Sequence, residues 1–219
     1  MAKSSQSRRD FLFTAMAGLA AAPLVYSCSG STEARSSTLF SKLAILRKNA
    51  NQDPDCEWCG ARDVPDNVTW KARMYREGDP GEQLIIDGTV YKPDGNTPAN
   101  DTLLYIYHTD NEGYYGRKGE PRHGKYRGWM LTGEDGKYSF WTIRPAPYPN
   151  RRSAAHIHMT VTGLDRKENW VDSIKFVGDP LLKPHEISKE RGGFPNVIPL
   201  KKDRDGIWRG TRNLILPKI

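Results

Sequence analysis

Cysteine is scarce in this sequence, which contains three: Cys28, Cys56 and Cys59. A zinc site built from four cysteines is therefore excluded. Cys56 and Cys59 are separated by two residues, a spacing found in redox-active pairs, in half of a zinc site and in local disulfides. No strand–helix–strand pattern typical of a thioredoxin fold surrounds the pair. A small structural disulfide in an oxidising compartment is the favoured interpretation.

The N-terminal segment lacks a hydrophobic run long enough to span a membrane. Its apolar stretch, Phe13 to Val25, is shorter than the roughly 20 residues that a spanning helix needs. It follows Arg8-Arg9-Asp10-Phe11-Leu12, and a twin-arginine pair ahead of a short apolar segment is typical of a Tat-type export signal. The basic residue that usually follows Phe-Leu is replaced by Phe13. We expect residues 1–28 to be this signal and the mature protein to leave the cytoplasm.

Two interpretations stay open for the end of the signal. Val25-Tyr26-Ser27-Cys28 resembles a lipoprotein cleavage box in which Cys28 carries the lipid, but Tyr26 is a poor match. An ordinary signal-peptidase site nearby is the alternative. The protein is thus expected to be periplasmic or to be a lipoprotein anchored to a membrane through Cys28. Residues 29–37, rich in Ser and Thr, are predicted to form a flexible tether. An N-terminal extension with the C-x-x-C pair is expected over 38–83, and the main domain over 84–219.

Acidic residues are outnumbered, with 26 Asp and Glu against 33 Lys and Arg, which gives a formal net charge of +7. The basic residues occur singly or in pairs such as Arg151-Arg152, without a long basic stripe, and no recognisable nucleic-acid-binding module is present. We expect a solvated basic surface and no nucleic-acid partner. Such a surface could still attract an anionic small molecule, such as an aromatic acid, toward a cleft.

Helical periodicity is missing from residue 84 onward, where short β-prone runs alternate with turn clusters. The predicted strands are 84–91, 102–109, 137–143, 155–162 and 171–177. Strands at this spacing predict an all-β fold, an antiparallel β-sandwich with long loops and little helix. Helix is expected only in the loosely amphipathic segment 38–50. The length suits one domain with a proper core.

The tripeptide His156-Ile157-His158 lies in one of the predicted strands. Residues two apart on a strand face the same side, so both imidazoles point one way and Ile157 points the other. Two histidines on one face can bind a metal. Zinc and copper sites use the same pattern, so on its own it indicates only a metal.

Two tyrosines in predicted loops add to this pattern. Tyr148 stands between two prolines, which restrict the backbone and hold the phenol in place. Tyr115 ends a turn that follows the predicted strand 102–109. Each is a core or surface tyrosine by default. Together with the H-x-H pair they argue against zinc, which favours His, Cys and carboxylate ligands.

From about Leu84 to Pro180 the sequence resembles the intradiol dioxygenase family, which includes protocatechuate 3,4-dioxygenase and catechol 1,2-dioxygenase. The combination of shared motifs is far more specific than any one of them. They are G-x-V at Gly88, G-x-Y at Gly113, D-G-x-Y-x-F-x-T-I-x-P-x-x-Y-P from Asp135 to Pro149, A-H-I-H from Ala155 to His158, and F-x-G-D-P from Phe176 to Pro180.

The resemblance implies a non-haem Fe(III) centre whose four ligands are all present: Tyr115, Tyr148, His156 and His158. It implies a catalytic β-sandwich over 84–219 that takes a catechol-type substrate and O2. Both oxygen atoms would enter the ring, which opens to a cis,cis-muconate-type product. Tyr148 would be the ligand that the substrate displaces, and so a catalytic residue. Hard phenolate oxygens suit ferric iron, whose positive charges two phenolates and a hydroxide offset.

The sequence departs from the family pattern beside the first histidine. The family typically has an arginine three residues before it, where Ser153 stands here. Arg152 is the neighbouring residue, and a shift by one position in a shortened loop would give it the catalytic role of stabilising charge on the substrate ring. Arg151 is the alternative. Residues 38–83 leave no room for the large helical dimerisation domain of catechol dioxygenases, and the sequence does not decide whether the protein is a homo-oligomer.

The sequence leaves two alternative functions. One is an exported β-sandwich lipoprotein that binds a ligand or supports a structure without turnover. Non-catalytic subunits of this family lack the metal ligands, whereas this chain has all four. The other is a protein that binds copper or zinc, instead of iron, through the H-x-H pair. Of the remaining histidines, His108 is expected to be structural, and His123 to lie in a loop over 116–128 that could cover the pocket.

Overall fold

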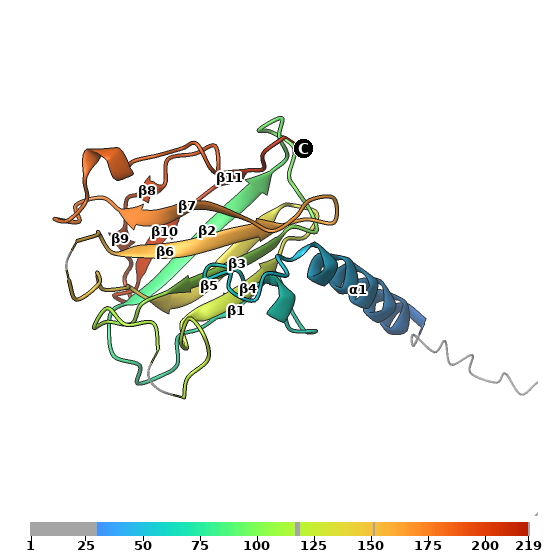
Figure 1. The fold of residues 1–219 in the computed structure, drawn as a ribbon, viewed down its shortest axis with the longest axis horizontal. Coiled ribbons are helices and arrows are strands. Elements are labelled where there is room, and N and C mark those ends of the chain that lie inside the picture. Colours follow the sequence, from blue (N-terminus) through green and yellow to red (C-terminus); the bar gives the residue numbers. More distant parts are fainter. Residues whose placement is uncertain (1–29, 117–118, 151, 219) are drawn as a thin grey trace, which may run out of the picture.

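The computed structural model describes residues 30–116, 119–150 and 152–218, with side chains from residue 38 onward. The signal expected over 1–28, with Cys28, and Arg151 lie outside the described residues. Within these ranges no helix is both long and apolar enough to cross a membrane. Figure 1 shows one body of β-strands with a single long helix at one end.

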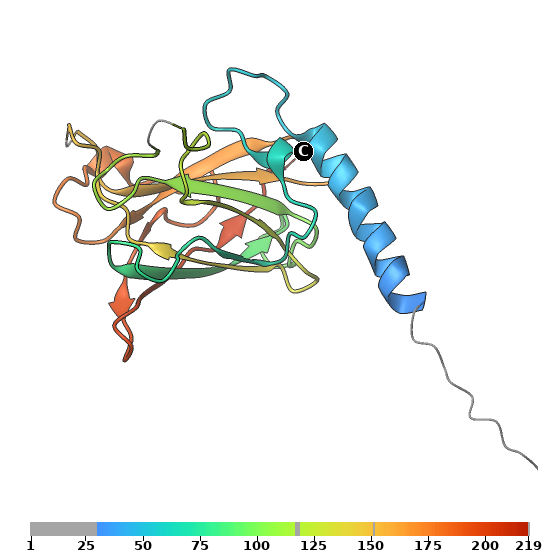
Figure 2. The same cartoon turned by 90° about the horizontal axis from the view of Figure 1, so that it is seen from below.

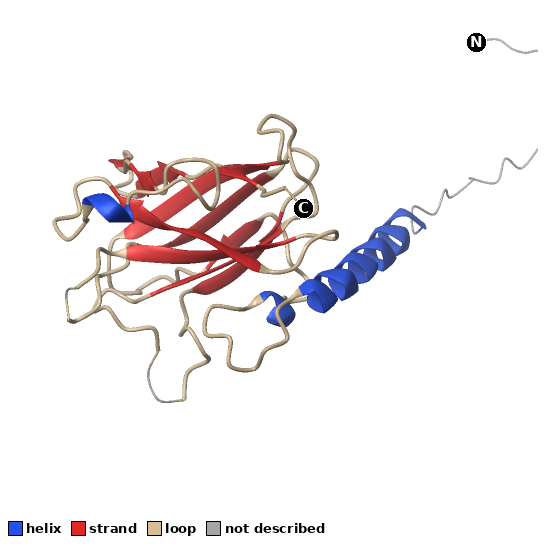
Figure 3. Cartoon of the chain, turned by 45° about the horizontal axis from the view of Figure 1, so that its top comes forward, coloured by secondary structure: helices blue, strands red, loops and turns tan. Residues whose placement is uncertain are grey.

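Two β-sheets form the body of the molecule (Figures 1 and 3). The first has the order β1 (Lys71–Arg73), β5 (Lys137–Ile143), β2 (Gln83–Tyr91), β10 (Trp208–Thr211), β9 (Lys201–Lys202), and β11 (Leu214–Ile215) also pairs with β2. The second has the order β4 (Arg127–Leu131), β3 (Leu103–His108), β6 (His156–Thr162), β7 (Asn169–Phe176), β8 (Val197–Ile198). The all-β prediction is confirmed, and the five predicted strands are β2, β3, β5, β6 and β7.

The sandwich is less purely antiparallel than expected. Its long strands pair antiparallel, but the short strands β1, β8, β10 and β11 each pair parallel to a longer neighbour. These strands are two to four residues long, too short to give a clear alternating pattern. β4 was also missed, because Arg127 and Gly128 fall at the end of a Gly- and Arg-rich segment that reads as a loop.

The main core lies between the two sheets and orients the histidines. Leu84, Ile86 and Val90 of β2 are fully buried there, as is Ile157 of β6. Burying a side chain of this size contributes about 1.5–3 kcal/mol. Since Ile157 points into the core, the histidines on either side of it point to the outer face of the second sheet.

Helix α1 (Gly30–Asn49) packs on the sandwich through its C-terminal half, whereas its N-terminal half extends away from the sheets (Figure 2). Leu43 and Leu46 are fully buried and pack in a second cluster with Leu103 and Leu131. The helix expected within 38–50 is present. It begins at Gly30, so the segment 30–37 is helical where a tether was expected. A helix already held by packing propagates into neighbouring residues at little cost.

The N-terminal extension is part of the sandwich rather than a separate unit. Its strand β1 pairs with β5 at the edge of the first sheet. Cys56 and Cys59 form the expected disulfide, which is followed by the short helix η1 (Ala61–Asp63). The segment 38–83, expected as an N-terminal extension, thus contributes a strand to the first sheet.

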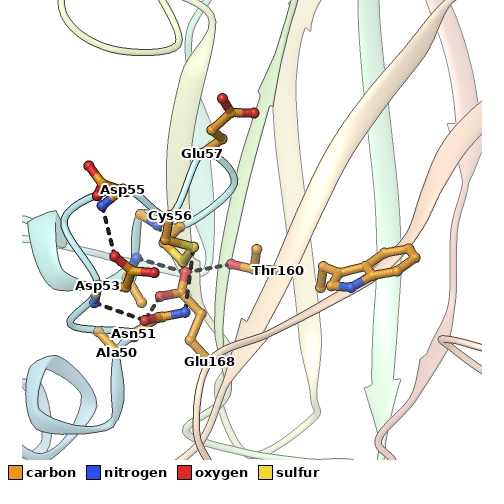
Figure 4. Close-up of a disulfide and its surroundings, with 12 residues drawn as sticks. Ala50, Asn51, Asp53, Asp55, Cys56, Glu57, Thr160 and Glu168 are labelled. Atoms are coloured by element: carbon orange, nitrogen blue, oxygen red, sulfur yellow. Dashed lines mark hydrogen bonds between the residues drawn. A yellow bond between two sulfur atoms is a disulfide. The ribbon is translucent and has the colours of Figure 1, made fainter.

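A buried carboxylate connects this extension to the second sheet. Glu168, which immediately precedes β7, is 6% exposed. Its Oε1 accepts hydrogen bonds from the backbone N–H groups of Gly60 (2.9 Å) and Ala61 (3.0 Å), and from the hydroxyl of Thr160 on β6 (3.0 Å). Its Oε2 accepts one from the N–H of Asn51 (3.1 Å). Figure 4 shows Glu168 between the disulfide loop and Thr160.

Candidate metal centre

The four predicted ligands come together at one end of the second sheet. His156 and His158 lie at the start of β6, Tyr115 lies in the loop after β3, and Tyr148 lies in the connection from β5 to β6. All four side chains are half-buried. Two loops and one strand thus contribute to one cluster.

The donor atoms of this cluster lie within hydrogen-bond distance of one another. The two phenol oxygens are 2.5 Å apart. The oxygen of Tyr148 is 3.1 Å from Nε2 of His156, and that of Tyr115 is 2.8 Å from Nε2 of His158. The two Nε2 atoms are 3.1 Å apart. Four atoms therefore point at one common centre.

This arrangement fits a shared cation. Four ligands at about 2.0–2.1 Å from one ion in a tetrahedral arrangement are separated by about 3.3 Å. The pairs that involve His156 or His158 are 2.8–3.4 Å apart, near that value, whereas the two phenol oxygens are closer, at 2.5 Å. Nδ1 of His156 is 2.7 Å from the carbonyl oxygen of Ala154, so Nδ1 carries the proton and Nε2 presents its lone pair to the centre. Phenol oxygens beside neutral imidazoles form a donor set that suits a hard ferric ion.

Burial sets the protonation state of these ligands. It lowers the pKa of His158 to about 3, with a further contribution from His156, and it lowers the pKa of His156. Both imidazoles are therefore neutral near pH 7, the form that binds a metal. Burial, together with the hydrogen bond between Tyr115 and Tyr148, raises the pKa of Tyr115. Ionisation of that phenol thus depends on a nearby cation, which reverses the local electrostatics.

The tyrosines are essential to any metal site here. Across the described ranges, no group of three or more His, Cys, Asp or Glu side chains is placed to bind a metal ion. A centre at His156 and His158 must take its remaining protein ligands from the two phenols.

A glycine allows the two tyrosine loops to approach each other. Gly113 has a φ of 92°, in the left-handed region that favours glycine. A Cβ at this position would lie 2.3 Å from the carbonyl oxygen of Pro147, the residue before Tyr148. The glycine of the G-x-Y motif therefore permits the contact that brings Tyr115 close to Tyr148.

An aromatic stack supports His158 from the neighbouring strand. Tyr107 of β3 is paired with His158 in the antiparallel register, and their rings stack with centroids 4.6 Å apart. His123 stacks on the other side of Tyr107 at 3.7 Å, and its Nδ1 is 2.6 Å from the hydroxyl of Tyr105. The role of Tyr107 was missed in the sequence, although the alternation of β3 places it on the same face as His158.

Two cavities open beside the cluster. One, of about 410 Å³, is lined by Tyr148, His156 and the charged residues Asp172, Lys175 and Glu186. The other, of about 330 Å³, lies on the side of Trp58 and Tyr107. They share three residues, His158, Trp170 and Ser173. The candidate ligands therefore lie next to space that could hold a small molecule.

The structure does not place Arg152 among the residues that line these cavities. Its side chain is exposed, and its carbonyl oxygen accepts a hydrogen bond from Lys183. Ser153 does line the larger cavity. Among the described lining residues, the one lysine or arginine is Lys175, which forms a 2.5 Å ion pair with Glu186 at the end of the short helix η2 (Pro184–Glu186).

His108 lies inside the sandwich rather than at the cluster. It is completely buried. Its Nδ1 is 2.6 Å from the carbonyl oxygen of Thr109, and its Nε2 is 2.6 Å from the hydroxyl of Thr142. A neutral imidazole that donates at Nδ1 and accepts at Nε2 satisfies both contacts. Burial lowers the pKa of His108 to about 4, which keeps it in that form.

Comparison with known proteins identifies the family. A family model described as Dioxygenase matches residues 64–197, which include β1 and all four candidate ligands. The chain belongs to the intradiol dioxygenase family. The match begins well before residue 84, in agreement with the place of β1 in the first sheet.

Several named intradiol dioxygenases are similar in sequence. A hydroxyquinol 1,2-dioxygenase of Nocardioides simplex is 29% identical over 160 residues, which is 62% of this chain and 54% of that protein. A chlorocatechol 1,2-dioxygenase of Rhodococcus opacus is 28% identical over 60% of this chain and 57% of that protein. The beta chain of a Burkholderia cepacia protocatechuate 3,4-dioxygenase is 29% identical, over 56% of this chain and 57% of that one. The chain thus spans a little over half the length of these relatives.

Solved structures share the fold. The 3-chlorocatechol 1,2-dioxygenase of Rhodococcus opacus 1CP superposes with a TM-score of 0.56 at 17% identity, covering 87% of this chain and 90% of that one. The dioxygenase domain of a dioxygenase carbohydrate-binding protein fusion from Streptomyces sp. SirexAA-E gives a TM-score of 0.54 at 21% identity, over 71% and 94%. At these identities the likeness concerns the β-sandwich alone.

Proposed function

We propose that the protein is a non-haem Fe(III)-dependent intradiol dioxygenase, which inserts both atoms of O2 into a catechol-type ring and forms a cis,cis-muconate-type product. The observation that carries this proposal is the convergence of Tyr115, Tyr148, His156 and His158 on one centre, in a chain of this family. Hydroxyquinol and chlorocatechol, named for two relatives, are both catechols, which supports that substrate class.

The two tyrosines have different places in this proposal. A ferric ion held by the four ligands would supply a Lewis-acidic centre for the two oxygens of a catechol. Tyr148 lines the 410 Å³ cavity, so its phenol faces the space for the substrate. This supports a role for its oxygen in accepting a proton from a substrate hydroxyl, as expected of the displaced ligand. Tyr115, which contacts His158 and lines neither of the two cavities, is proposed as the permanent phenol ligand.

The cation that reaches the substrate is proposed to be Lys175 rather than Arg152. Lys175 lies opposite His156 in the β6–β7 pairing and lines the same cavity. Its side chain is 13% exposed and is held by the ion pair with Glu186, and an ammonium has three N–H donors, so two remain for a group in the cavity. Lys175→Met should reduce kcat/KM for catechols at least tenfold, and Arg152→Ala less than threefold. The reverse order would restore the assignment to Arg152.

Reconstitution with ferric iron tests the proposed function directly. The loaded protein should be red-brown from tyrosinate-to-iron charge transfer, its colour should shift on adding catechol, and oxygen uptake should match formation of the ring-opened dicarboxylate. Tyr148→Phe and His156→Ala should each lower bound iron or turnover. Tyr114→Phe is the matched control, because Tyr114 is 52% exposed beside Tyr115. Protein that stays colourless and iron-free after supplementation would refute the proposal. Iron binding without oxygen uptake would favour the non-catalytic lipoprotein.

The proposed site of action is outside the cytoplasm. Support comes from the twin-arginine segment at Arg8-Arg9 and from the disulfide between Cys56 and Cys59, which suits an oxidising compartment. Replacement of Arg8 and Arg9 by lysines should keep the protein in the cytoplasm, as fractionation would show. Labelling with a radioactive fatty acid, lost in Cys28→Ser, would identify the lipid anchor, whereas an unlabelled, cleaved protein would indicate an ordinary signal-peptidase site.

A further inference from the structure

We propose that the cavity beside Trp58 binds a second aromatic ring of the substrate, so that the preferred substrate is a catechol carrying an aryl substituent. This inference rests on the proposed function and concerns its substrate class. It gives the Cys56–Cys59 loop a role in specificity, because that loop supplies Trp58 to the cavity wall.

The two cavities that meet at His158 differ in chemistry. The larger one contains Tyr148 and His156 together with the ion pair of Lys175 and Glu186, so it is the polar end where a catechol would reach the metal ligands. The smaller one is mainly aromatic and apolar. Its lining includes the rings of Trp58, Tyr107 and Trp170, beside the core residues Met159 and Val171. At about 330 Å³ it lies at the lower end of the range for small-molecule sites. A single ring bound at the ligands would leave it unfilled.

Trp58 is held on a rigid support. It lies between the two cysteines of the disulfide and is half-buried. The carbonyl oxygen of Glu57 is 2.5 Å from Nε2 of His123, and the carbonyl of Cys56 accepts a hydrogen bond from Arg122. Both contacts precede Trp58, and after it the N–H of Gly60 donates to the carboxylate of Glu168, so the backbone is held on either side of Trp58.

The same contacts connect the loop to the metal centre. His123, which contacts Glu57, stacks on Tyr107, and Tyr107 stacks on His158. A continuous row of contacts, made by stacked rings, thus holds the loop at a defined position relative to His158, a candidate metal ligand. An aromatic wall at a fixed distance from the metal can select a planar ring at a fixed distance from the catechol oxygens.

Trp170 provides an exposed aromatic surface at the junction of the cavities. Its side chain is 41% exposed although it is large and apolar. The guanidinium of Arg191 lies 3.9 Å from its ring centroid and covers one face. Preformed aromatic surfaces bind rings at a low cost in conformational entropy. Trp170 and Trp58 both line the smaller cavity, and Trp170 also lines the larger one.

Comparison of 4-phenylcatechol with catechol tests the inference on the full chain loaded with ferric iron. Steady-state kinetics give kcat/KM for each compound, and calorimetry without oxygen gives each binding constant independently of turnover. The wild-type protein should prefer 4-phenylcatechol on the order of tenfold in both measurements. Trp58→Ala should remove most of that preference and affect catechol less, whereas Trp58→Phe should retain it. Trp70→Ala is the control, because Trp70 is 43% exposed and lines neither cavity.

The outcomes separate this inference from the proposed function. Equal affinities and equal kcat/KM for the two compounds in the wild-type protein would overturn the inference. If both compounds were still ring-opened, the proposed function would stand. Equal losses for both compounds in Trp58→Ala, at an unchanged unfolding midpoint, would also overturn it. Selective binding of 4-phenylcatechol without ring opening would refute the proposed function and support the aromatic site. Binding of neither compound would refute both.

Discussion

The carboxylate of Glu168 gives the sharpest test of how the N-terminal extension is attached. It is 6% exposed and lies between the disulfide loop and β6, where it accepts one hydrogen bond from Thr160 and three from backbone N–H groups more than 100 residues away in the sequence. Glu168→Ala removes every one of these acceptors without removing any donor. The N–H groups of Gly60 and Ala61 would be left inside the protein without a partner.

The expected cost follows from those unpaired groups. Each buried N–H that loses its acceptor costs about 1–3 kcal/mol, and a hydroxyl such as that of Thr160 can turn elsewhere. We expect Glu168→Ala to lower the free energy of unfolding by about 3–5 kcal/mol, a large part of the 5–15 kcal/mol typical of a domain. Glu168→Gln keeps one side-chain oxygen, which can still accept from the N–H groups of Gly60 and Ala61, but it loses the negative charge. It should therefore lower the free energy of unfolding by about 1–2 kcal/mol.

Urea unfolding gives these free energies, and amide hydrogen exchange locates them. Protection should fall first at Gly60 and Ala61, whose N–H groups contact the carboxylate. Glu134→Gln is the matched control, because Glu134 is exposed in the turn before β5. A loss below about 0.5 kcal/mol in Glu168→Ala, with protection at Gly60 unchanged, would show that the attachment does not depend on this carboxylate.

Three further predictions concern the core, the metal centre and the disulfide. The pKa of His108 is about 4 in the folded protein and about 6.5 in the unfolded chain, so the unfolded chain takes up the proton first as pH falls. The free energy of unfolding should therefore fall by about 3 kcal/mol between about pH 6.5 and pH 4. Urea titrations at these two pH values should show a smaller fall in His108→Gln. Gly113→Ala should reduce bound iron at least tenfold by metal analysis, whereas Gly119→Ala, with the same φ of 92° but open space around it, should not. Replacing Cys56 and Cys59 by serine should lower the free energy of unfolding by about 2 kcal/mol, measured by thermal or urea unfolding under non-reducing conditions. An unchanged free energy would show that the disulfide does not restrict the unfolded chain.

The strands and the orientation of the histidines were predictable because they depend on local patterns. The alternation in 84–91 and 137–143 reappears as the pairing of β2 with β5. The two-residue spacing of His156 and His158 places both on the outer face, while Ile157 is fully buried in the core. Short strands such as β1 and β10 were not predictable, since they owe their extended shape to a neighbour rather than to their own residues.

By itself, the sequence determined the β-sandwich, the four candidate ligands and the chemistry that phenol and imidazole donors favour. Only the tertiary structure decided that Tyr115 and Tyr148 meet at 2.5 Å, that Lys175 rather than Arg152 lines the cavity, and that Trp58 forms a wall beside His158. The physical reason is the range of the contacts. Side-chain direction along a strand is set by neighbouring residues, whereas the loop of Trp58 is placed by Glu168, more than 100 residues away in the chain.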